Sequence, residues 1–401
     1  MIKLCDKKDC TGCSSCYNVC VHQALSMQPD KEGFLYPVID VDKCKECSLC
    51  EKACPVLNED KLYDNDPAPS TYALCAEDSI CQRSSSGGAF SLLAMLFINR
   101  GGVVFGAAIN SNNEVYHTSI TSIDELDKLR GSKYVQSTLG YSYREVREIL
   151  QKGRLVLFTG TPCQIAGLKR FLRKPYPNLF LVDIFCHGVP SPLFLHKTSS
   201  ILSDRGYDVT KSLIFRDTKT WKYQQSYGNH VVKYNSPDDI YLQSFLKGLN
   251  FRESCYRCPF AALPRQGDIS IGDFWGIGRW KLFGHDTTHG VSCILINNSK
   301  GIELWQDIQK EAYCEARSLK EAKLANPNIF RASRRPNLRD TFYEDFDNMH
   351  LDDFLRKYKV FHKPFSVRNY VSKWIGFSPD STSYLVNVCL LYTSDAADDL
   401  T

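Results

Sequence analysis

The chain has 401 residues, a formal net charge of +4 and a 43% share of hydrophobic residues. This length suffices for two or three domains, and the small net charge argues against a nucleic-acid-binding protein, which would carry a strong basic patch. The most apolar run, residues 89–98, is too short for a membrane span of about 20 residues, and no secretory signal pattern is seen. We therefore expect a cytoplasmic protein without a membrane span or a nucleic-acid partner.

Eighteen cysteines are the most unusual feature of the composition. Disulfides are disfavoured in the cytoplasm, so these residues indicate metal binding. The segments "CTGCSSCYNVC" and "CKECSLCEKACP" both have the spacing C-x2-C-x2-C-x3-C, which is typical of bacterial ferredoxins with two [4Fe-4S] clusters. Zinc sites more often show two separated pairs of ligands.

In such runs the fourth cysteine ligates the other cluster. The spacing therefore predicts two ligand sets. The first is Cys10, Cys13, Cys16 and Cys54, and the second is Cys44, Cys47, Cys50 and Cys20. Cys5 has no partner at a usable spacing and is interpreted as a free thiol. Residues 1–60 are thus predicted to form an α+β ferredoxin-like module that carries electrons one at a time.

A polar linker is predicted over residues 61–72, followed by an α/β core over residues 73–300. In chain order we expect a helix at 87–99, a strand at 102–109, and helices in "SIDELDKLR" and "YREVREILQK". The segments "RLVLFTG", "QIAGLKRFL" and "NLFLVDIFC" predict a buried strand, a helix and a second buried strand, and hence a parallel strand–helix–strand unit. A helical region is expected over 301–389, and residues 390–401 resemble a non-native tail.

Four further cysteines lie beside turn signals. Cys163 follows "GTP", Cys186 ends a buried strand, and Cys255 and Cys258 form a C-x2-C pair. Both single cysteines follow predicted parallel strands, where α/β proteins place ligands. The four residues are therefore a candidate third ligand set, with zinc as the alternative to an iron–sulfur cluster. Each lone cysteine is also typical of an ordinary buried position.

Three loops are candidates for cofactor binding. Small residues at helix starts in "SSSGGAF" and "TGTP" can present backbone N–H groups to an anion. The segment "RGSKYVQS" adds Lys133 and Tyr134, and Lys133 could neutralise a phosphate or lie near a ring. Each loop is equally typical of an ordinary solvated turn. Neither a G-x-G-x-x-G fingerprint nor a P-loop is present.

Taken together, "SGGAF", "GSKYVQS", "GTPCQIAGLKRFL", "DIFCHGVPSP", "CYRCPF" and "DISIGDFWG" resemble the beta-subunit family of coenzyme F-420 (deazaflavin) hydrogenases and dehydrogenases. The resemblance covers about residues 1–300. It implies FAD and a core [4Fe-4S] cluster, with the cluster on Cys163, Cys186, Cys255 and Cys258. The residues that it places near the flavin are Ser86, Gly87, Gly88, Lys133, Tyr134, Thr159, Gly160 and Thr161.

The resemblance also implies a reaction. Electrons from a ferredoxin or a partner subunit would pass through the clusters to FAD and on to a small hydride acceptor, reversibly. The acceptor would be a deazaflavin or a substrate of a polysaccharide pathway. Lys133 and His187 are the candidate catalytic residues, and Asp273 and Trp275 are further candidates near the flavin. Two alternatives remain: an electron-transfer subunit without its own substrate site, and a zinc-bearing scaffold fused to a ferredoxin.

Overall fold

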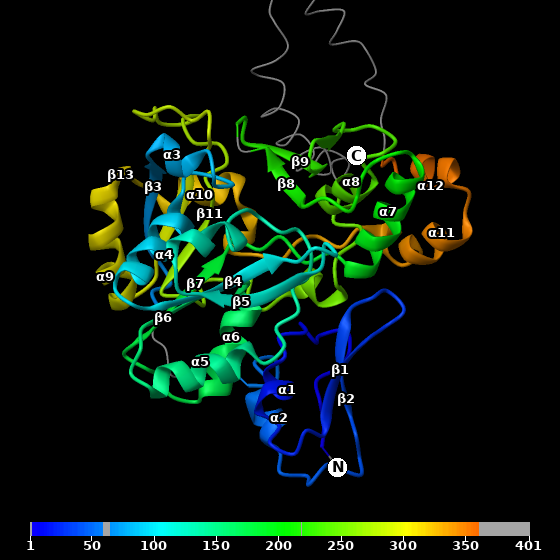
Figure 1. Ribbon diagram of the computed structural model, residues 1–401, viewed down its shortest axis with the longest axis horizontal. Coiled ribbons are helices and arrows are strands. Elements are labelled where there is room, and N and C mark those ends of the chain that lie inside the picture. Colours follow the sequence, from blue (N-terminus) through cyan, green and yellow to red (C-terminus); the bar gives the residue numbers. More distant parts are fainter. Residues whose placement is uncertain (1, 59–64, 218, 361–401) are drawn as a thin grey trace, which may run out of the picture.

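A computed structural model describes residues 2–58, 65–217 and 219–360 (Figure 1). Its centre is an eight-stranded sheet in the order β13-β3-β12-β11-β7-β6-β4-β5. The bounds of these strands are β3 Ser70–Ala76, β4 Val103–Ile109, β5 Val115–Ile120, β6 Val156–Gly160, β7 Leu179–Ile184, β11 Ile269–Asp273, β12 Ser292–Ile296 and β13 Ala312–Arg317.

The middle of this sheet is parallel and its two sides are antiparallel. Strand β6 pairs in parallel with β4 and β7, and β7 pairs in parallel with β11. Helix α6 (Pro162–Leu172) connects β6 to β7, so the predicted parallel strand–helix–strand unit is confirmed. Residues 156–158 of β6 are fully buried because the sheet is covered on both faces.

Helices cover the two faces of the sheet in separate layers. Helices α4 (Ala89–Asn99) and α9 (Ser299–Ile308) pack against each other over one face, and their apolar side chains join Leu157 in one core cluster. Helices α5 (Ser142–Gln151) and α6 cover the other face, where they pack with Val156 and Phe158. Successive residues of β6 thus enter opposite cores, as the two-residue period of a strand requires.

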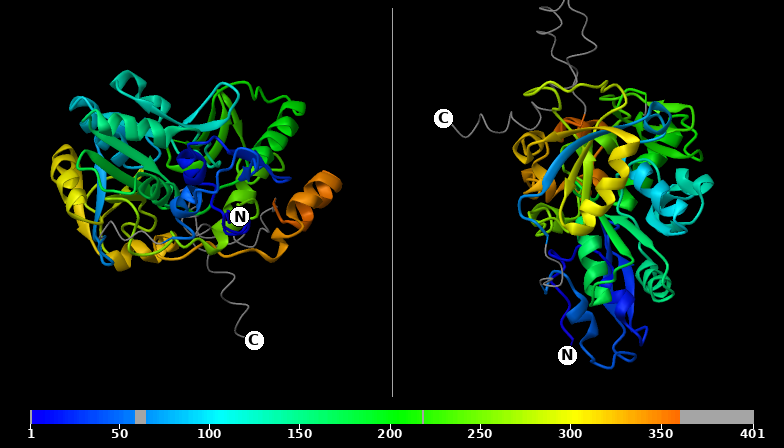
Figure 2. Two further views of the ribbon diagram at one scale, coloured as in Figure 1. Left: turned by 90° about the horizontal axis from the view of Figure 1, so that it is seen from below. Right: turned by 90° about the vertical axis from the view of Figure 1, so that its left-hand side faces the viewer.

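The cysteine-rich module lies beside the second of these layers, at the end of the molecule drawn in blue (Figures 1 and 2). It consists of an antiparallel pair of strands and two short helices: β1 Leu25–Pro29, β2 Leu35–Ile39, α1 Ser15–Val19 and α2 Leu49–Ala53. Val19 and Ala53 pack into the same apolar cluster as Ile165 and Leu168 of α6. The module and the sheet therefore share one continuous core.

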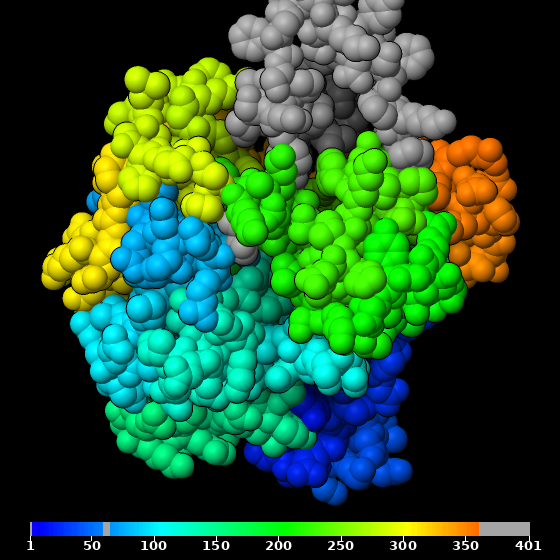
Figure 3. Space-filling view, turned by 45° about the horizontal axis from the view of Figure 1, so that its top comes forward, coloured from blue at the N-terminus to red at the C-terminus, as the bar shows by residue number. Residues whose placement is uncertain are grey.

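A second lobe contains a three-stranded antiparallel sheet in the order β10-β9-β8 and four helices. Its elements are α7 Pro192–Asp204, β8 Leu213–Asp217, β9 Lys222–Tyr227, β10 His230–Val232, α8 Ile240–Leu246, α11 Phe342–Asn348 and α12 Leu351–Lys357. The remaining helices are α3 Asp78–Cys81 and α10 Leu319–Ala325. A space-filling view shows the surface hollowed between this green lobe and the light blue segment around α3 (Figure 3).

The structure differs from three sequence expectations. Residues 70–72, expected in the linker, begin strand β3, and residues 312–317, expected in a helical region, form the edge strand β13. Residues 123–128 form a 3-10 helix, Ile123–Lys128, in place of an α-helix. Alternating apolar and polar residues in 312–317 were a strand signal. The expected non-native tail, residues 390–401, lies outside the described residues.

Within the described ranges, no helix has both the length and the apolar character needed to cross a lipid bilayer.

Candidate cluster sites and cofactor cavity

The first predicted ligand set lies together in a buried part of the module. Burial raises the pKa of Cys13 and Cys16, and the charges of neighbouring thiols, Cys54 among them, raise both further. Cys5 has no partner at cluster spacing, but its thiol hydrogen-bonds with those of Cys10 and Cys54. These two bonds are the main cause of the lowered pKa values, about 6 for Cys10 and about 7 for Cys54. Five thiols thus meet where four were predicted.

The second predicted ligand set also converges. Cys20, Cys44, Cys47 and Cys50 line one small cavity together with apolar residues such as Leu25. Cys47 is exposed, whereas Cys50 is buried. This set is therefore the more exposed of the two.

The third set comes from three separate segments that the sheet brings together. Cys163 lies in the first turn of α6 and Cys186 follows β7, while Cys255 lies within the 3-10 helix Glu253–Arg257 and Cys258 directly follows it. Burial, with a smaller contribution from the charge of Cys163, raises the pKa of Cys255 and of Cys258 to about 12. Burial and the charges of Cys163, Cys255 and Cys258 likewise raise the pKa of Cys186.

Backbone N–H groups point at these thiols. The N–H of Val189 donates to the Sγ atom of Cys255 at 3.4 Å, and Phe260 and Ala261 donate to Cys258. Such bonds favour a thiolate, while burial opposes it. A metal group that displaces the thiol protons resolves this conflict, so the residues fit a metal-bound group.

Each ligand set has four thiols, the number that either a zinc ion or a cubane cluster binds. In the part of the chain that the structure describes, no three His, Cys, Asp or Glu side chains converge on one metal-ion position. Zinc would require four ligands at about 2.0–2.3 Å from one centre.

A cavity of about 290 Å³ lies at the carboxyl ends of the parallel strands. This volume is close to the lower bound for small-molecule sites, and its position is where open α/β sheets bind ligands. The cavity is lined by nearly all the residues that were predicted to contact a cofactor, namely Ser86, Gly88, Lys133, Tyr134, Thr159, Gly160 and Thr161, and also by Cys186, His187, Asp273 and Trp275.

Gly87 is the exception, because it does not line the cavity. A Cβ atom at Gly87 would come within 2.1 Å of the carbonyl oxygen of Leu74 and 2.5 Å of the amide nitrogen of Ser292. Only glycine allows the turn to approach strands β3 and β12 this closely. Its role is therefore to place the start of α4 at the cavity.

One end of the cavity is suited to an anion. Helix α4 starts there after Gly88, whose φ of 86° favours glycine, and the first N–H groups of a helix attract negative charge. Lys133 lies on the same loop wall, where its Nζ atom donates to the carbonyl oxygens of Leu129 at 2.9 Å and Arg130 at 2.6 Å. Burial lowers the pKa of Lys133 to about 7, so a bound anion would draw a proton onto it.

His117 of β5 also lines the cavity, although no sequence pattern indicated it. Its Nε2 atom lies 3.2 Å from the carbonyl oxygen of Thr159 and its Nδ1 atom lies 2.9 Å from the hydroxyl of Ser137. Because a carbonyl can only accept, Nε2 carries the proton and Nδ1 accepts from Ser137. Burial lowers the pKa of His117 to about 4. A histidine in a short edge strand carries no distinctive sequence signal.

The other end of the cavity is aromatic and encloses a buried ion pair. The guanidinium of Arg216 lies 2.7 Å from Asp273 and 3.1 Å from the hydroxyl of Tyr134. Trp275 stacks on Trp221 with ring centroids 4.8 Å apart, and the indole N–H of Trp221 donates to Asp273. Asp273 and Trp275 thus lie at the cavity as the sequence suggested, but their main partner, Arg216, was not foreseen.

His187 lies between the aromatic end and the core thiols. It lines the cavity directly after Cys186, and burial lowers its pKa while the charge of Asp273 raises it. The hydroxyl of Ser333 donates to its carbonyl oxygen. The arrangement holds a neutral imidazole between the thiol set and the cavity.

Comparison with known proteins agrees with this two-part construction. Residues 153–322 match the family described as the C-terminal part of the coenzyme F-420 hydrogenase/dehydrogenase beta chain, and residues 9–58 match the 4Fe-4S dicluster domain. The chain is 25% identical over 236 residues to one component, designated F, of the F(420)H(2) dehydrogenase of Methanosarcina mazei. This match covers 56% of the chain and 66% of the relative.

The chain is also similar to an uncharacterised ferredoxin of Methanocaldococcus jannaschii, with 38% identity over 50 residues. This match covers 12% of the chain and 64% of the ferredoxin. Both matches span slightly less than two thirds of the relative's length. A solved structure of the F-420-reducing [NiFe] hydrogenase complex from Methanosarcina barkeri aligns with a TM-score of 0.46 and 18% identity, over 68% of this chain and 91% of the matched chain.

Proposed function

Since the chain carries the C-terminal domain of the coenzyme F-420 hydrogenase/dehydrogenase beta-subunit family behind a 4Fe-4S dicluster domain, we propose that it is an iron–sulfur flavoprotein oxidoreductase. It would pass electrons between a redox partner and a small hydride acceptor of the deazaflavin type. The front module would hold two [4Fe-4S] clusters, the core thiols a third, and the cavity FAD. The name of the Methanosarcina mazei relative supports an F-420-type acceptor.

One observation carries this proposal: Cys186 belongs both to the core thiol set and to the cavity wall. A cluster on this set would therefore touch the cofactor cavity directly. Clusters carry one electron and flavins exchange either one or two, so bound FAD would supply the conversion between hydride and single electrons.

The chain's own residues have definable tasks in this reaction. The start of α4 and Lys133 would bind the phosphate portion of the cofactor, because backbone N–H groups and an ammonium both favour an anion. Tyr134 and Trp275 would pack on flat rings. His187, neutral and next to Cys186, would accept and hold the proton that accompanies hydride transfer. The buried walls exclude water from the reacting atoms.

The direct test is anaerobic purification with iron, sulfide and flavin analysis. About twelve irons and one FAD per chain would support the proposal, whereas about eight irons without flavin would overturn the assignment of the core. A Cys258→Ser variant should lose about four irons and keep the two front clusters. A Cys314→Ser variant, which changes a cysteine outside all three sets, is the matched control and should keep all of them.

The alternative is an electron-transfer subunit whose substrate chemistry lies on a partner. The relative is named as one component of a dehydrogenase, which favours this reading, as does the exposed Cys47 of the second cluster set. The two proposals differ in one measurement. The isolated chain, reduced with dithionite, should reduce a deazaflavin if it has its own substrate site, and a Lys133→Met variant should weaken that activity.

A further inference from the structure

Arg252 places a positive charge between the first module cluster set and the core set. Its side chain is completely buried. The Nε atom donates to the carbonyl oxygen of Cys10 at 2.6 Å, and Nη1 donates to the carbonyl oxygen of Leu35 at 3.0 Å and to the side chain of Gln136 at 3.2 Å. The guanidinium carbon also lies 3.9 Å from the centre of the Tyr36 ring. One residue of the core thus contacts both parts of the protein.

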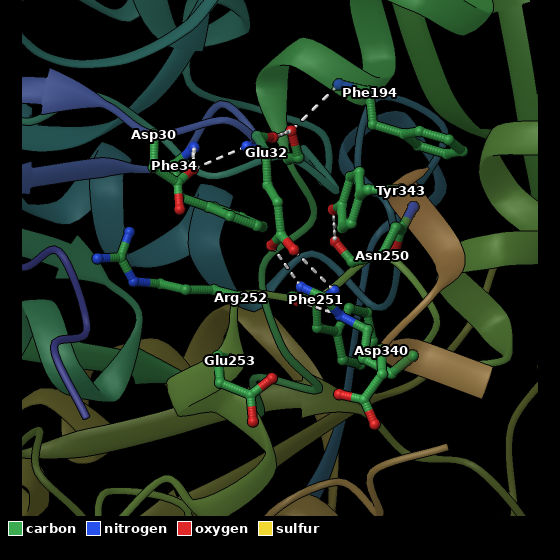
Figure 4. A network of polar contacts seen from close by, with 12 residues as sticks. Asp30, Glu32, Phe34, Phe194, Asn250, Phe251, Arg252, Glu253, Asp340 and Tyr343 are labelled. Atoms are coloured by element: carbon green, nitrogen blue, oxygen red, sulfur yellow. Dashed lines mark hydrogen bonds and ion pairs between the residues drawn. The ribbon is translucent and has the colours of Figure 1, made fainter. Parts of the chain in front are cut away.

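Within the described part of the chain, no carboxylate forms an ion pair with this charge. Among residues 2–58, 65–217 and 219–360, none lies within 4.0 Å of the Arg252 guanidinium as an ion-pair partner. Two acidic residues of the surrounding segments are paired with other arginines: Glu253 with Arg335 at 3.0 Å, and Glu32 with Arg339 at 2.6 Å. Figure 4 shows the Arg252 side chain running away from Glu253.

The guanidinium also keeps an unused donor. Its Nη2 atom is buried and has no hydrogen-bond partner. A buried charge without a partner is costly, as is an unsatisfied buried donor. The groups that can offset both costs belong to the two thiol sets beside Arg252: its Nε atom donates to the carbonyl oxygen of Cys10, and the N–H of Cys255 donates to the carbonyl oxygen of Arg252 at 2.9 Å.

We propose that Arg252 is a positioning residue shared by two clusters: its charge raises the reduction potentials of both the Cys10 cluster and the core cluster, and Nη2 donates to a cluster sulfur. This inference rests on the proposed function, since it requires both clusters. Transfer between them oxidises one cluster by one electron and reduces the other by one, with no bond made and no proton moved. The guanidinium of Arg252 stabilises the added negative charge whichever of the two clusters holds the electron.

The test is a redox titration of the complete, cluster-loaded chain, followed by electron paramagnetic resonance. Arg252→Gln should shift the potentials of two of the three clusters to more negative values and leave the cluster on Cys20, Cys44, Cys47 and Cys50 unchanged. Arg252→Lys should give a smaller shift in the same direction, because it keeps the charge and loses the planar set of donors. Signals are assigned with Cys47→Ser and Cys258→Ser variants.

Arg144→Gln is the matched control, because Arg144 also joins the core to the module, through the carbonyl oxygens of Asn18 at 2.7 Å and Cys20 at 2.8 Å. It should leave the Cys10 and core potentials unchanged. Unchanged potentials in Arg252→Gln, or equal shifts in Arg252→Gln and Arg144→Gln, would overturn the inference. If Arg252→Gln fails to fold, an unshifted Arg252→Lys variant would overturn it. A wild-type chain without three cluster signals would instead refute the proposed function.

Discussion

Cys13 of the front module lies directly against Gly167 of helix α6. A Cβ atom at Gly167 would come within 3.1 Å of both the Cβ and the Sγ atoms of Cys13. Gly167 is one helical turn after Cys163, and the charge of Cys163 contributes to the raised pKa of Cys13. Helix α6 therefore joins a predicted ligand of the first module set to a predicted ligand of the core set, so the two thiol sets are neighbours.

We predict that Gly167→Ala destabilises the junction between module and core. The added methyl group would also approach the hydroxyl of Tyr143 at 3.0 Å, and overpacking of this kind costs about 1–3 kcal/mol. Urea unfolding should show that loss, together with faster release of iron from the first module cluster. Glu145→Ala, on an exposed position of α5, is the control. An unchanged unfolding midpoint in Gly167→Ala would contradict the prediction.

The second prediction concerns Lys133 and pH. Burial lowers its pKa to about 7, so the side chain gains its charge as pH falls through 7. Binding of FAD to the flavin-free chain should therefore strengthen from pH 8 to pH 6, as read by quenching of flavin fluorescence. Lys133→Met should weaken binding and remove this pH dependence, whereas Lys128→Met, at an exposed lysine of the neighbouring turn, should retain it.

The third prediction concerns acid stability through His117. Its pKa in the folded chain is about 4, below the ordinary value of 6.5. Below pH 6.5 the unfolded chain binds a proton that the folded chain does not, so stability is lost progressively as pH falls from about 6.5 to about 4. His117→Gln should unfold with a smaller difference between pH 7 and pH 5 than the wild type. His230→Gln, on the exposed strand β10, should behave like the wild type.

The fourth prediction concerns the ion pair between Glu32 of the module and Arg339 of the C-terminal part. Arg339 is nearly fully buried and also donates to the carbonyl oxygen of Phe251. Glu32→Gln leaves this cation without its partner and should lower the free energy of unfolding by about 3 kcal/mol. Asp347→Asn, which breaks the exposed pair with Lys197, should cost less than about 1 kcal/mol. Equal effects would show that the buried pair does not hold the module.

Local patterns were sufficient for much of the fold. The strand–helix–strand unit around Cys163 follows from uninterrupted apolar runs and a helix start, which are properties of neighbouring residues. The expected linker at 70–72 and the expected helical region at 312–317 were wrong, because both segments pair with each other as β3 and β13. The alternation within 312–317 indicates a strand but does not identify its partner, which lies more than 200 residues away along the chain.

The sequence by itself determined the cysteine chemistry of the front module, because the ligands of a cluster that wraps a short loop must recur at a short spacing. It also indicated which loops face the cavity, since strands end and helices begin there. Only the tertiary structure decided that Cys5 joins the first set, that Cys163, Cys186, Cys255 and Cys258 meet, that His117 lines the cavity, and that Arg252 lies between two sets. These relationships depend on segments that the sheet topology brings together. Burial and charge act between side chains that are close in space, whatever their distance along the chain.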